Sequence, residues 1–343
     1  MLKGVVRSST TRVLASVVLL GASGAVGTGQ EKSAEQAVGG LEVLQVRPDV
    51  YMIAGAGANI AVQIGQDGVV VVDTGTAERA EQVVAEIRKL TPRAIRYIIN
   101  TSADADHVGG NERLSAAGRS IIPTGGLNEI GAFVGRAPII AEERVLARMG
   151  APQGQEAAFS TGALPTHTYS AALRELQKDV FLNGQAVQIS YQPAAHTDGD
   201  SVVFFRRSDV VVAGDVMDTT RFPMIDLSKG GTIQGLIHSL NRIIELTVPP
   251  VPLTWQEGGT TVIPGHGRLC EEAEVVDYRD MLTIIRDRVQ DSIKKGLTLE
   301  QVQKTNPTQG YRRRYGSDSG SWTTQMFVEA VYKSLTPKTG SRP

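Results

Sequence analysis

Short apolar runs that end in acidic residues and histidines constrain this chain more than any other feature. The run Ile95–Ile99 is followed by Asn-Thr-Ser-Ala-Asp-Ala-Asp-His, which contains the cluster Asp104, Asp106 and His107. Similar runs precede three further metal-capable side chains, those of His196, Asp215 and His266. Apolar, β-branched runs of this length predict buried strands. We therefore expect these side chains to lie on turns at strand ends, where a sheet holds them at fixed separations.

The first half of the chain predicts strands joined by tight turns, with one clear helix. Apolar runs occur at 41–46, 50–53, 58–64 and 69–72, and Gly65-Gln-Asp-Gly68 predicts a hairpin between the last two. An amphipathic helix is expected from about residue 77, because apolar residues recur there at helical spacing until Pro92. After His107 the pattern predicts short strands at 121–122 and 139–140 and helices at 112–117 and 142–149.

The second half repeats this pattern and then becomes helical. Asn183-Gly184 predicts a hairpin between strands at 180–182 and 187–191, and further strands are expected at 201–205, 210–212 and 262–264. An apolar stripe after His266 predicts a helix that ends near Gly296, and Thr298 with Gln301 predicts the capping box of the next helix. The pattern favours two packed sheets with helices outside. It is compatible with both α/β and α+β folds.

Composition and charge narrow the class of protein. The chain has 343 residues, 41% hydrophobic and 21% charged, which is typical of a globular protein with a substantial core. The formal net charge of −1 gives no reason to expect nucleic acid or an anionic membrane surface as a partner. Cys270 is the sole cysteine, which excludes a disulfide within the chain. We expect a small-molecule substrate; the pattern does not predict the oligomeric state.

The N-terminus has the pattern of an export signal. Lys3, Arg7 and Arg12 precede or flank a short apolar stretch at 13–20, and small residues follow as far as Gly27. This is the order of a secretory signal peptide, and the apolar stretch is too short for a typical membrane-spanning helix. We therefore expect residues 1–27 to be a signal peptide and 28–40 a flexible lead-in. The mature protein would be periplasmic or secreted, with no stable membrane insertion.

Taken together, the metal-capable segments resemble the metallo-β-lactamase superfamily, a group of metal-dependent hydrolases that includes glyoxalase II-like thioesterases. The family's first motif is His-x-His-x-Asp-His, which this chain matches at Asp106 and His107. Ser102 and Asp104 stand where the family has its first two histidines. The chain also matches a second family signature at 70–75 and the later ligands at His196, Asp215 and His266.

The resemblance covers about residues 40 to 270 and implies a fold and a division of the chain. The family has a four-layer αββα sandwich with its metal site at one edge, between the two sheets. Residues 41–270 would form this domain, and 271–343 would be a C-terminal helical extension packed on it.

The resemblance also implies two groups of metal ligands that share one carboxylate. Asp106, His107 and His266 would form one group with Asp215, which suits a bridging position because each carboxylate oxygen can serve one cation. The other group would contain Asp104, His196 and Asp215, with Ser102 as a doubtful fourth member because a neutral hydroxyl is a weak ligand. Asp106 and Asp215 are the expected catalytic acids. One or two divalent ions are expected, with zinc as the first choice and manganese or iron as alternatives.

These ligands predict a metal-dependent hydrolase of a small-molecule ester, thioester, lactone or amide. A bound cation lowers the pKa of water to about 7, so that hydroxide is present at neutral pH. The altered first motif leaves a second hypothesis, a catalytically degenerate protein that keeps the fold and binds a metal or a ligand. Redox chemistry at a di-iron site is a third, although the chain carries no flavin-binding domain. The family name alone gives no reason to choose a β-lactam substrate.

Other polar residues have simpler interpretations. Asp73 is expected to cap the following helix or to hydrogen-bond the ligand loop from behind. Asp198 and Asp200 are interpreted as residues that shape a loop rather than as ligands. Cys270 is interpreted as a plain thiol near a helix start. The two remaining histidines, His167 and His238, have no ligand-like context and are expected at the surface.

Overall fold

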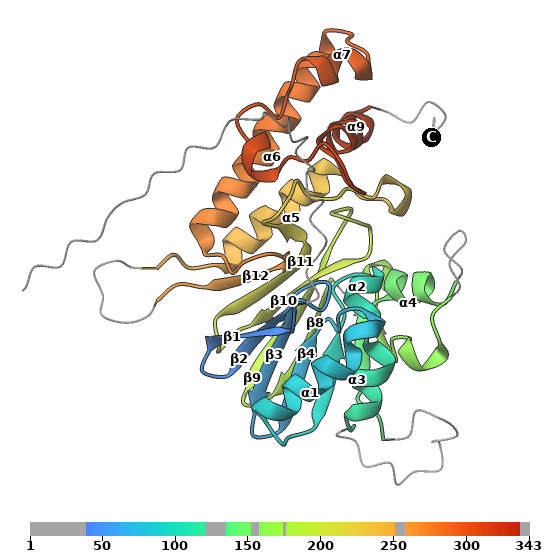
Figure 1. The fold of residues 1–343 in the computed structure, drawn as a ribbon, viewed down its shortest axis with the longest axis vertical. Helices are drawn as coiled ribbons and strands as arrows, with labels where there is room; N and C mark the ends of the chain where they lie inside the picture. The colour runs from blue at the N-terminus through green and yellow to red at the C-terminus, as the bar shows by residue number, and fades with distance from the viewer. Residues whose placement is uncertain (1–38, 121–134, 152–157, 174–175, 251–257, 337–343) are drawn as a thin grey trace, which may run out of the picture. The chain divides into compact units, whose positions relative to one another are not determined.

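Two mixed β-sheets lie at the centre of the protein in the computed structural model (Figure 1). The structure describes residues 39–120, 135–151, 158–173, 176–250 and 258–336, and Gly40–Pro343 form one compact unit. The predicted signal peptide, most of the predicted lead-in and the predicted strand at 121–122 lie outside the described residues.

The first sheet has seven strands in chain order. Its first four strands pair antiparallel and the later neighbours pair parallel. The strands are β1 (Glu42–Arg47), β2 (Val50–Ala54), β3 (Ile60–Gly65), β4 (Gly68–Val72), β5 (Ile95–Ile99), β6 (Ile139–Glu142) and β7 (His167–Tyr169).

The second sheet has five strands, and only one pair of neighbouring strands is parallel. In spatial order the strands are β12 (Thr261–His266), β11 (Val210–Asp218), β10 (Asp200–Phe205), β9 (Gln185–Gln192) and β8 (Gln177–Leu182). The pair β11 and β12 is parallel, and every other pair is antiparallel.

Alternating side chains of β4 show how the sheets are packed. Val70 and Val72 belong to the apolar cluster shared with the second sheet, whereas Val69 and Val71 contact the helices on the other face. Successive strand residues point to opposite faces, so a strand covered on both sides is apolar throughout. Strand β4 is therefore an uninterrupted run of buried residues.

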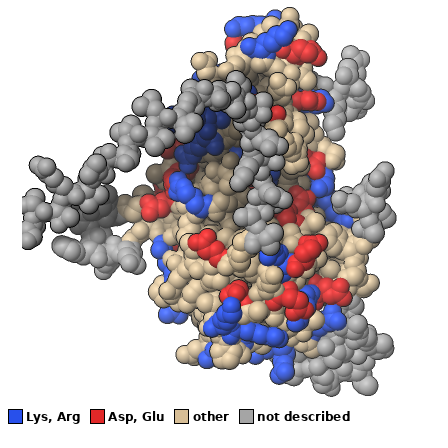
Figure 2. Space-filling model, viewed as in Figure 1, with Lys and Arg blue, Asp and Glu red and all other residues tan. Residues whose placement is uncertain are grey.

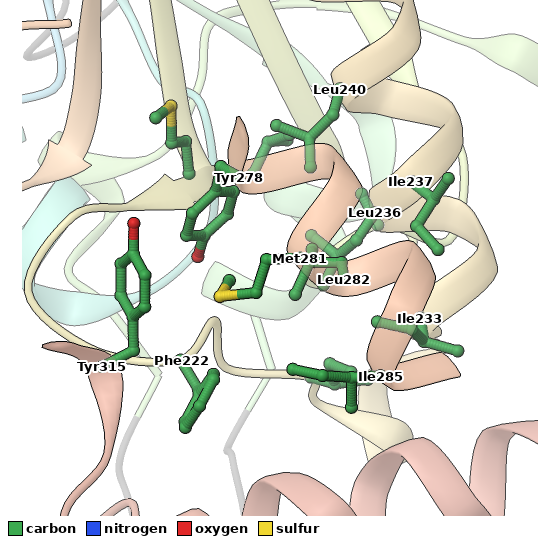
Figure 3. Close-up of a cluster of buried hydrophobic side chains, with 14 of the residues drawn as sticks. Phe222, Ile233, Leu236, Ile237, Leu240, Tyr278, Met281, Leu282, Ile285 and Tyr315 are labelled. Atoms are coloured by element: carbon green, nitrogen blue, oxygen red, sulfur yellow. The ribbon is translucent and has the colours of Figure 1, made fainter. Parts of the chain in front are cut away.

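Helices cover the outer faces of both sheets, which gives the predicted αββα order of layers (Figure 1). The first sheet packs against α1 (Ala80–Leu90) and α3 (Asn111–Ala117). The second sheet packs against α5 (Ile233–Leu246), α6 (Glu272–Lys294) and α9 (Thr324–Leu335). Figure 3 shows how side chains of α5 and α6, Tyr278 of α6 among them, meet in this cluster beside Phe222 and Tyr315.

The remaining helices are short, and several of their ends were predicted. The helix α4 (Glu143–Met149) begins after Glu142, and α7 (Leu299–Lys304) begins with the expected capping box of Thr298 and Gln301. Gly296 adopts a φ of 76° just after α6, as predicted for the residue that ends that helix. The other elements are α2 (Ala105–Val108), α8 (Arg312–Tyr315) and the 3-10 turns η1 (Ala77–Arg79), η2 (Thr161–Ala163), η3 (Ala171–Leu173) and η4 (Leu227–Lys229).

The surface carries both signs of charge. Figure 2 shows lysines and arginines interspersed with acidic residues over one face of the molecule. Within the ranges that the structure describes, no helix is both long enough and apolar enough to cross a membrane.

Candidate metal centre

The predicted ligands converge where several strands of both sheets end. Asp104, Asp106 and His107 follow β5, and the last two lie on the short helix α2. His196 follows β9, and His266 is the last residue of β12. These segments lie far apart in the sequence, and the two sheets bring them to one place.

Asp215 lies within a strand rather than on a turn, which corrects the sequence-based expectation. Strand β11 continues to Asp218, with irregular pairing to β12 on either side of Gly214. Gly214 has a φ of 53°, and a Cβ atom there would lie 2.6 Å from the Thr101 hydroxyl oxygen. Only glycine fits this bulge, and a bulge of this kind redirects the neighbouring side chain. His266 likewise lies inside its strand rather than beyond it.

Asp106, His107 and His266 form one group of possible ligands, whose atoms lie within 4.8 Å of one another. His266 Nε2 is 3.3 Å from Asp106 Oδ2 and 3.4 Å from Asp215 Oδ1. His107 Nε2 is 3.2 Å from the same Asp215 oxygen. We call these three residues, together with Asp215 Oδ1, the second group.

Asp104, His196 and Asp215 form the other group of possible ligands, within the same limit of 4.8 Å. His196 Nε2 is 3.4 Å from Asp104 Oδ2, and His196 Nδ1 is 3.8 Å from Asp215 Oδ2. We call this the first group. The two oxygens of Asp215 thus face different groups, which is the arrangement that a bridging carboxylate requires.

The buried histidine nitrogens test whether a cation fits. His107 Nδ1 is 2.8 Å from Asp73 Oδ2, and a carboxylate can only accept, so Nδ1 carries the proton in the neutral ring. Nε2 then has a lone pair that faces the Asp215 carboxylate and lacks a hydrogen-bond partner. Both ring nitrogens of His196 are also buried without a hydrogen bond, with Nδ1 3.6 Å from Asp200 Oδ1 and Nε2 3.4 Å from Asp104 Oδ2. Only the nitrogen without a proton could bind a cation. Nitrogen and oxygen lone pairs that face one another in this way are suited to a divalent cation.

The electrostatics agree with this interpretation. Burial alone would raise the pKa of the Asp215 carboxyl, but the three surrounding histidines hold that pKa far below its usual value. Burial likewise opposes charge on His196, yet the carboxylates around it raise its pKa to about 9. The pKa of His107 is also raised, against the effect of burial, by Asp215 and Asp73. The site therefore attracts positive charge, and a metal ion would displace protons on binding.

Asp73 supports the second group from behind, as one of the two sequence-based interpretations expected. Its carboxylate accepts hydrogen bonds from the backbone N–H and the hydroxyl of Thr101, at 2.8 and 2.6 Å, in addition to its contact with His107. Asp73 has a φ of 61°, in the left-handed region that aspartate and asparagine tolerate better than most residues. This backbone conformation directs the carboxylate at the imidazole.

Replacing Asp73 by asparagine is expected to weaken metal binding about 10- to 100-fold, the usual effect of losing a partner that orients a metal-binding histidine. Asparagine tolerates the same φ and keeps the size, so the fold should persist. Competition titration with a chromophoric chelator measures the affinity. The matched control is Asp49→Asn, because Asp49 also accepts side-chain hydrogen bonds, from Gln63 and Ser208, but lies before β2 and away from the ligands. Equal affinities in the two variants would contradict the role given to Asp73.

Several other polar residues have hydrogen-bond or ion-pair partners of their own. Ser102 is buried, and its hydroxyl oxygen accepts from the backbone N–H of Asp104 at 3.2 Å. Asp200 accepts from the N–H and the hydroxyl of Thr197, and Asp198 pairs with Arg148. The remaining candidates lie outside the site, because Cys270 is buried in the apolar cluster of the second sheet and His167 and His238 are exposed.

Two cationic residues, Lys229 and Arg221, lie at the site. Lys229 was not predicted from the sequence as a residue of the site. Its Nζ is 2.9 Å from Asp104 Oδ1 and 3.3 Å from Asp226 Oδ2. Burial opposes its charge, but Asp104 and Asp226 raise its pKa. Arg221 Nε lies 2.8 Å from Asp218 Oδ2, and Arg221 lines the pocket at the ligands.

The pocket at the ligands is small. It has a volume of about 60 Å³ and is lined by members of both groups, namely Asp104, Asp106, Asp215 and His266, and by Asp218, Arg221 and Met224. We call the partly exposed Arg221 and Met224 its rim. The C-terminal helices hold this rim, because the Phe222 N–H donates to the Tyr315 carbonyl at 2.9 Å and the Trp322 indole donates to the Phe222 carbonyl at 3.1 Å. A larger cavity of about 790 Å³ lies at the opposite ends of the strands, beside Arg47 and Asp209, and contains no predicted ligand.

The comparisons with known proteins agree with the geometry of the site. The sequence profile of the metallo-beta-lactamase superfamily matches residues 54–266. A search of curated proteins found no match. A solved sec-alkylsulfatase from Pseudomonas sp. is similar with a TM-score of 0.57 and 17% identity, over 85% of this chain and 50% of that one. This chain therefore spans half the length of that enzyme.

Two solved β-lactamases are similar over nearly their whole length. The metallo-beta-lactamase from Pontibacter korlensis has a TM-score of 0.52 and 16% identity, over 71% of this chain and 99% of that one. The DIM-1 metallo-beta-lactamase has a TM-score of 0.51 and 16% identity, over 72% and 98%. At these identities the likeness of structures shows the fold alone. With the profile match, which spans every predicted ligand, it leads to one conclusion: the chain belongs to the metallo-β-lactamase superfamily.

Proposed function

We propose that this protein is a metal-dependent hydrolase of a small-molecule ester, thioester, lactone or amide. The observation that carries the proposal is the second group, in which His107 Nε2, buried without a hydrogen-bond partner, and His266 Nε2 face the same oxygen of Asp215. A structural role alone does not account for this arrangement, because buried nitrogens without partners are costly. They become favourable once a cation is bound.

In the proposed reaction, some residues would hold the metal ion and others would transfer protons. A divalent ion bound here would supply Lewis acidity and a water of pKa about 7. His107 and His266 would hold the ion, and Asp73 would fix the ring of His107. Asp106 has a side chain 36% exposed and lines the pocket together with Asp215. Asp106, the more exposed of the two, would accept the proton of the attacking water and return it to the leaving group. Asp215, whose pKa the histidines hold far below its usual value, would serve as a ligand.

The dimensions of the pocket limit how the substrate binds. A volume of about 60 Å³ admits only a few atoms, since one water molecule takes up about 30 Å³ of liquid. The reacting carbonyl would enter, and the remainder of the substrate would lie over the rim. Arg221 stands there with a side chain 38% exposed, so a substrate with an anionic group beyond the scissile bond would be favoured.

A metal-loading and substrate panel tests the proposal. The purified protein is stripped with a chelator, reloaded with zinc, manganese or iron(II), and assayed on esters, thioesters, lactones, amides, β-lactams and phosphodiesters. Sulfate esters join the panel because a sec-alkylsulfatase shares the fold. We expect turnover of at least one acyl substrate that chelation removes and metal restores. Background rates on the whole panel, with metal shown to be bound, would exclude a catalytic role.

That last outcome would favour the alternative, a degenerate member of the family that binds a metal or ligand without catalysis. Two observations support this alternative: the hydroxyl of Ser102 is bonded to the backbone, and the ammonium of Lys229 occupies one oxygen of Asp104. Both concern the first group, and neither affects the second. Catalysis by the second group alone is therefore compatible with both observations.

A further inference from the structure

The first group already has a positive charge beside it, the ammonium of Lys229. Lys229 Nζ donates to Asp104 Oδ1 at 2.9 Å, which leaves Asp104 Oδ2 as the oxygen that faces His196. The side chains of Lys229 and Asp104 are 28% and 21% exposed, so solvent screens the pair only partly. The ion-pair partners of Asp106 in the second group and of Asp215 are histidines instead.

The turn that carries Lys229 is tied to the ligand segment itself. The Asp226 N–H donates to the His196 carbonyl at 3.0 Å, and the Asp198 N–H donates to the Lys229 carbonyl at 2.9 Å. The Asp226 carboxylate accepts from the N–H of Lys229 at 3.1 Å, and Gly230 closes the turn with a φ of 81°. Lys229 is therefore a positioned residue of the site, unlike a lysine on a free surface loop.

We propose that Lys229 takes the electrostatic place of the metal ion in the first group, so that this protein binds one divalent ion, in the second group. The inference rests on the proposed metal site and adds its stoichiometry. A divalent ion among Asp104, His196 and Asp215 would be close to the ammonium, and like charges repel strongly in a partly buried site. The first group would also lack a fourth protein ligand, because Ser102 is neutral and already bonded.

The ammonium would also act on the substrate. Its Nζ is held by Asp104, whose other oxygen faces His196, so the ammonium would approach a substrate from the first-group side of the site. An ammonium carries three N–H donors, of which Asp104 and Asp226 use two. The third can donate to an oxygen of the substrate. Lys229 thus becomes a specificity-determining residue for substrates with an oxygen at that position.

Zinc titration of the full-length, metal-stripped protein tests the inference. We expect the wild type to bind one equivalent tightly, by competition with a chromophoric chelator and by elemental analysis. Lys229→Met removes the charge and keeps the apolar stem, so it should bind a second equivalent at least about tenfold more tightly than the wild type does. Lys89→Met is the matched control, because Lys89 also forms a lysine–carboxylate pair, with Glu86, on α1. It should behave as the wild type.

Two further variants protect the test against misfolding. Lys229→Arg keeps the charge and should keep one equivalent, with a thermal melting curve like that of the wild type. Asp104→Asn should also keep one tight equivalent, because Asp104 does not belong to the second group. Two tight equivalents in the wild type, or no gain in Lys229→Met with its fold intact, would overturn the inference. No zinc bound by the wild type would instead overturn the proposed metal site itself.

Discussion

An Asp215→Asn variant is expected to lose tight metal binding and, with it, all metal-dependent hydrolysis. Asp215 Oδ1 lies 3.2 Å from His107 Nε2 and 3.4 Å from His266 Nε2, while Oδ2 faces His196. Asparagine has the same size but replaces one oxygen by an NH₂ group that cannot ligate a cation. The affinity should fall by more than about 100-fold, because loss of a direct ligand exceeds the 10–100-fold effect of losing an outer partner.

The matched control for this variant lies at the other end of the same strand. Asp209 precedes β11 and accepts from the Thr260 hydroxyl at 2.7 Å, and its φ of 56° is one that asparagine tolerates. Asp209→Asn should therefore keep wild-type zinc content and rate. Both are measured by elemental analysis after gel filtration and by the panel assay. Full zinc content in Asp215→Asn would rule out the shared carboxylate as a ligand.

Replacing Phe327 by alanine is expected to reduce the free energy of unfolding by about 3–5 kcal/mol, the usual cost of removing a buried phenylalanine ring. Phe327 on α9 is fully buried, and its ring stacks on that of Phe222 with centroids 4.7 Å apart and planes 1° apart. The deletion would leave a cavity between the C-terminal helices and the segment after β11. Zinc content of the folded variant should not change, because Phe327 contacts no ligand.

Denaturant unfolding measures this difference. The control is Phe181→Ala, because Phe181 on β8 has 75% of its surface exposed and should change the free energy of unfolding by about 0.5 kcal/mol or less. Similar losses in the two variants would show that the apolar cluster of the second sheet does not account for stability as described. A loss of zinc in folded Phe327→Ala would show that the C-terminal helices also shape the ligand groups.

The ligand set could be predicted from sequence because its signal is local. Asp106 and His107 adjoin a strand, and His266 stands in a short Gly-His-Gly segment, so motif and strand predictions supported each other. The structure places these residues in the two groups that the resemblance implied. Their coordination of metal remains a prediction. The bulge at Gly214 was not predictable, because it depends on the close approach of Thr101 from the segment after β5.

Lys229 could not be found in the same way. It lies in a turn without a motif, and its contact with Asp104 joins residues 125 positions apart. The helices α5 and α9 were not predicted either, although the sequence of α5 carries a helical signal. Residues Ile233, Leu236, Ile237 and Leu240 recur at helical spacing after Thr232, which caps the helix, so the periodicity was available in the sequence. No element was predicted between the strands at 210–212 and 262–264, so this helix was missed.

The hydrogen bonds from Phe222 to Tyr315 and from Trp322 to Phe222 have a consequence for how this protein can evolve. Under the proposed function, Arg221 and Met224 form the entrance for the substrate, and the neighbouring Phe222 is anchored about a hundred residues downstream, at Tyr315 and Trp322. Mutations in that distant segment can reshape the entrance while the cation-holding residues stay untouched. Under the proposed function, exchanging the C-terminal segment between relatives is therefore expected to change substrate preference while the ligand residues stay the same.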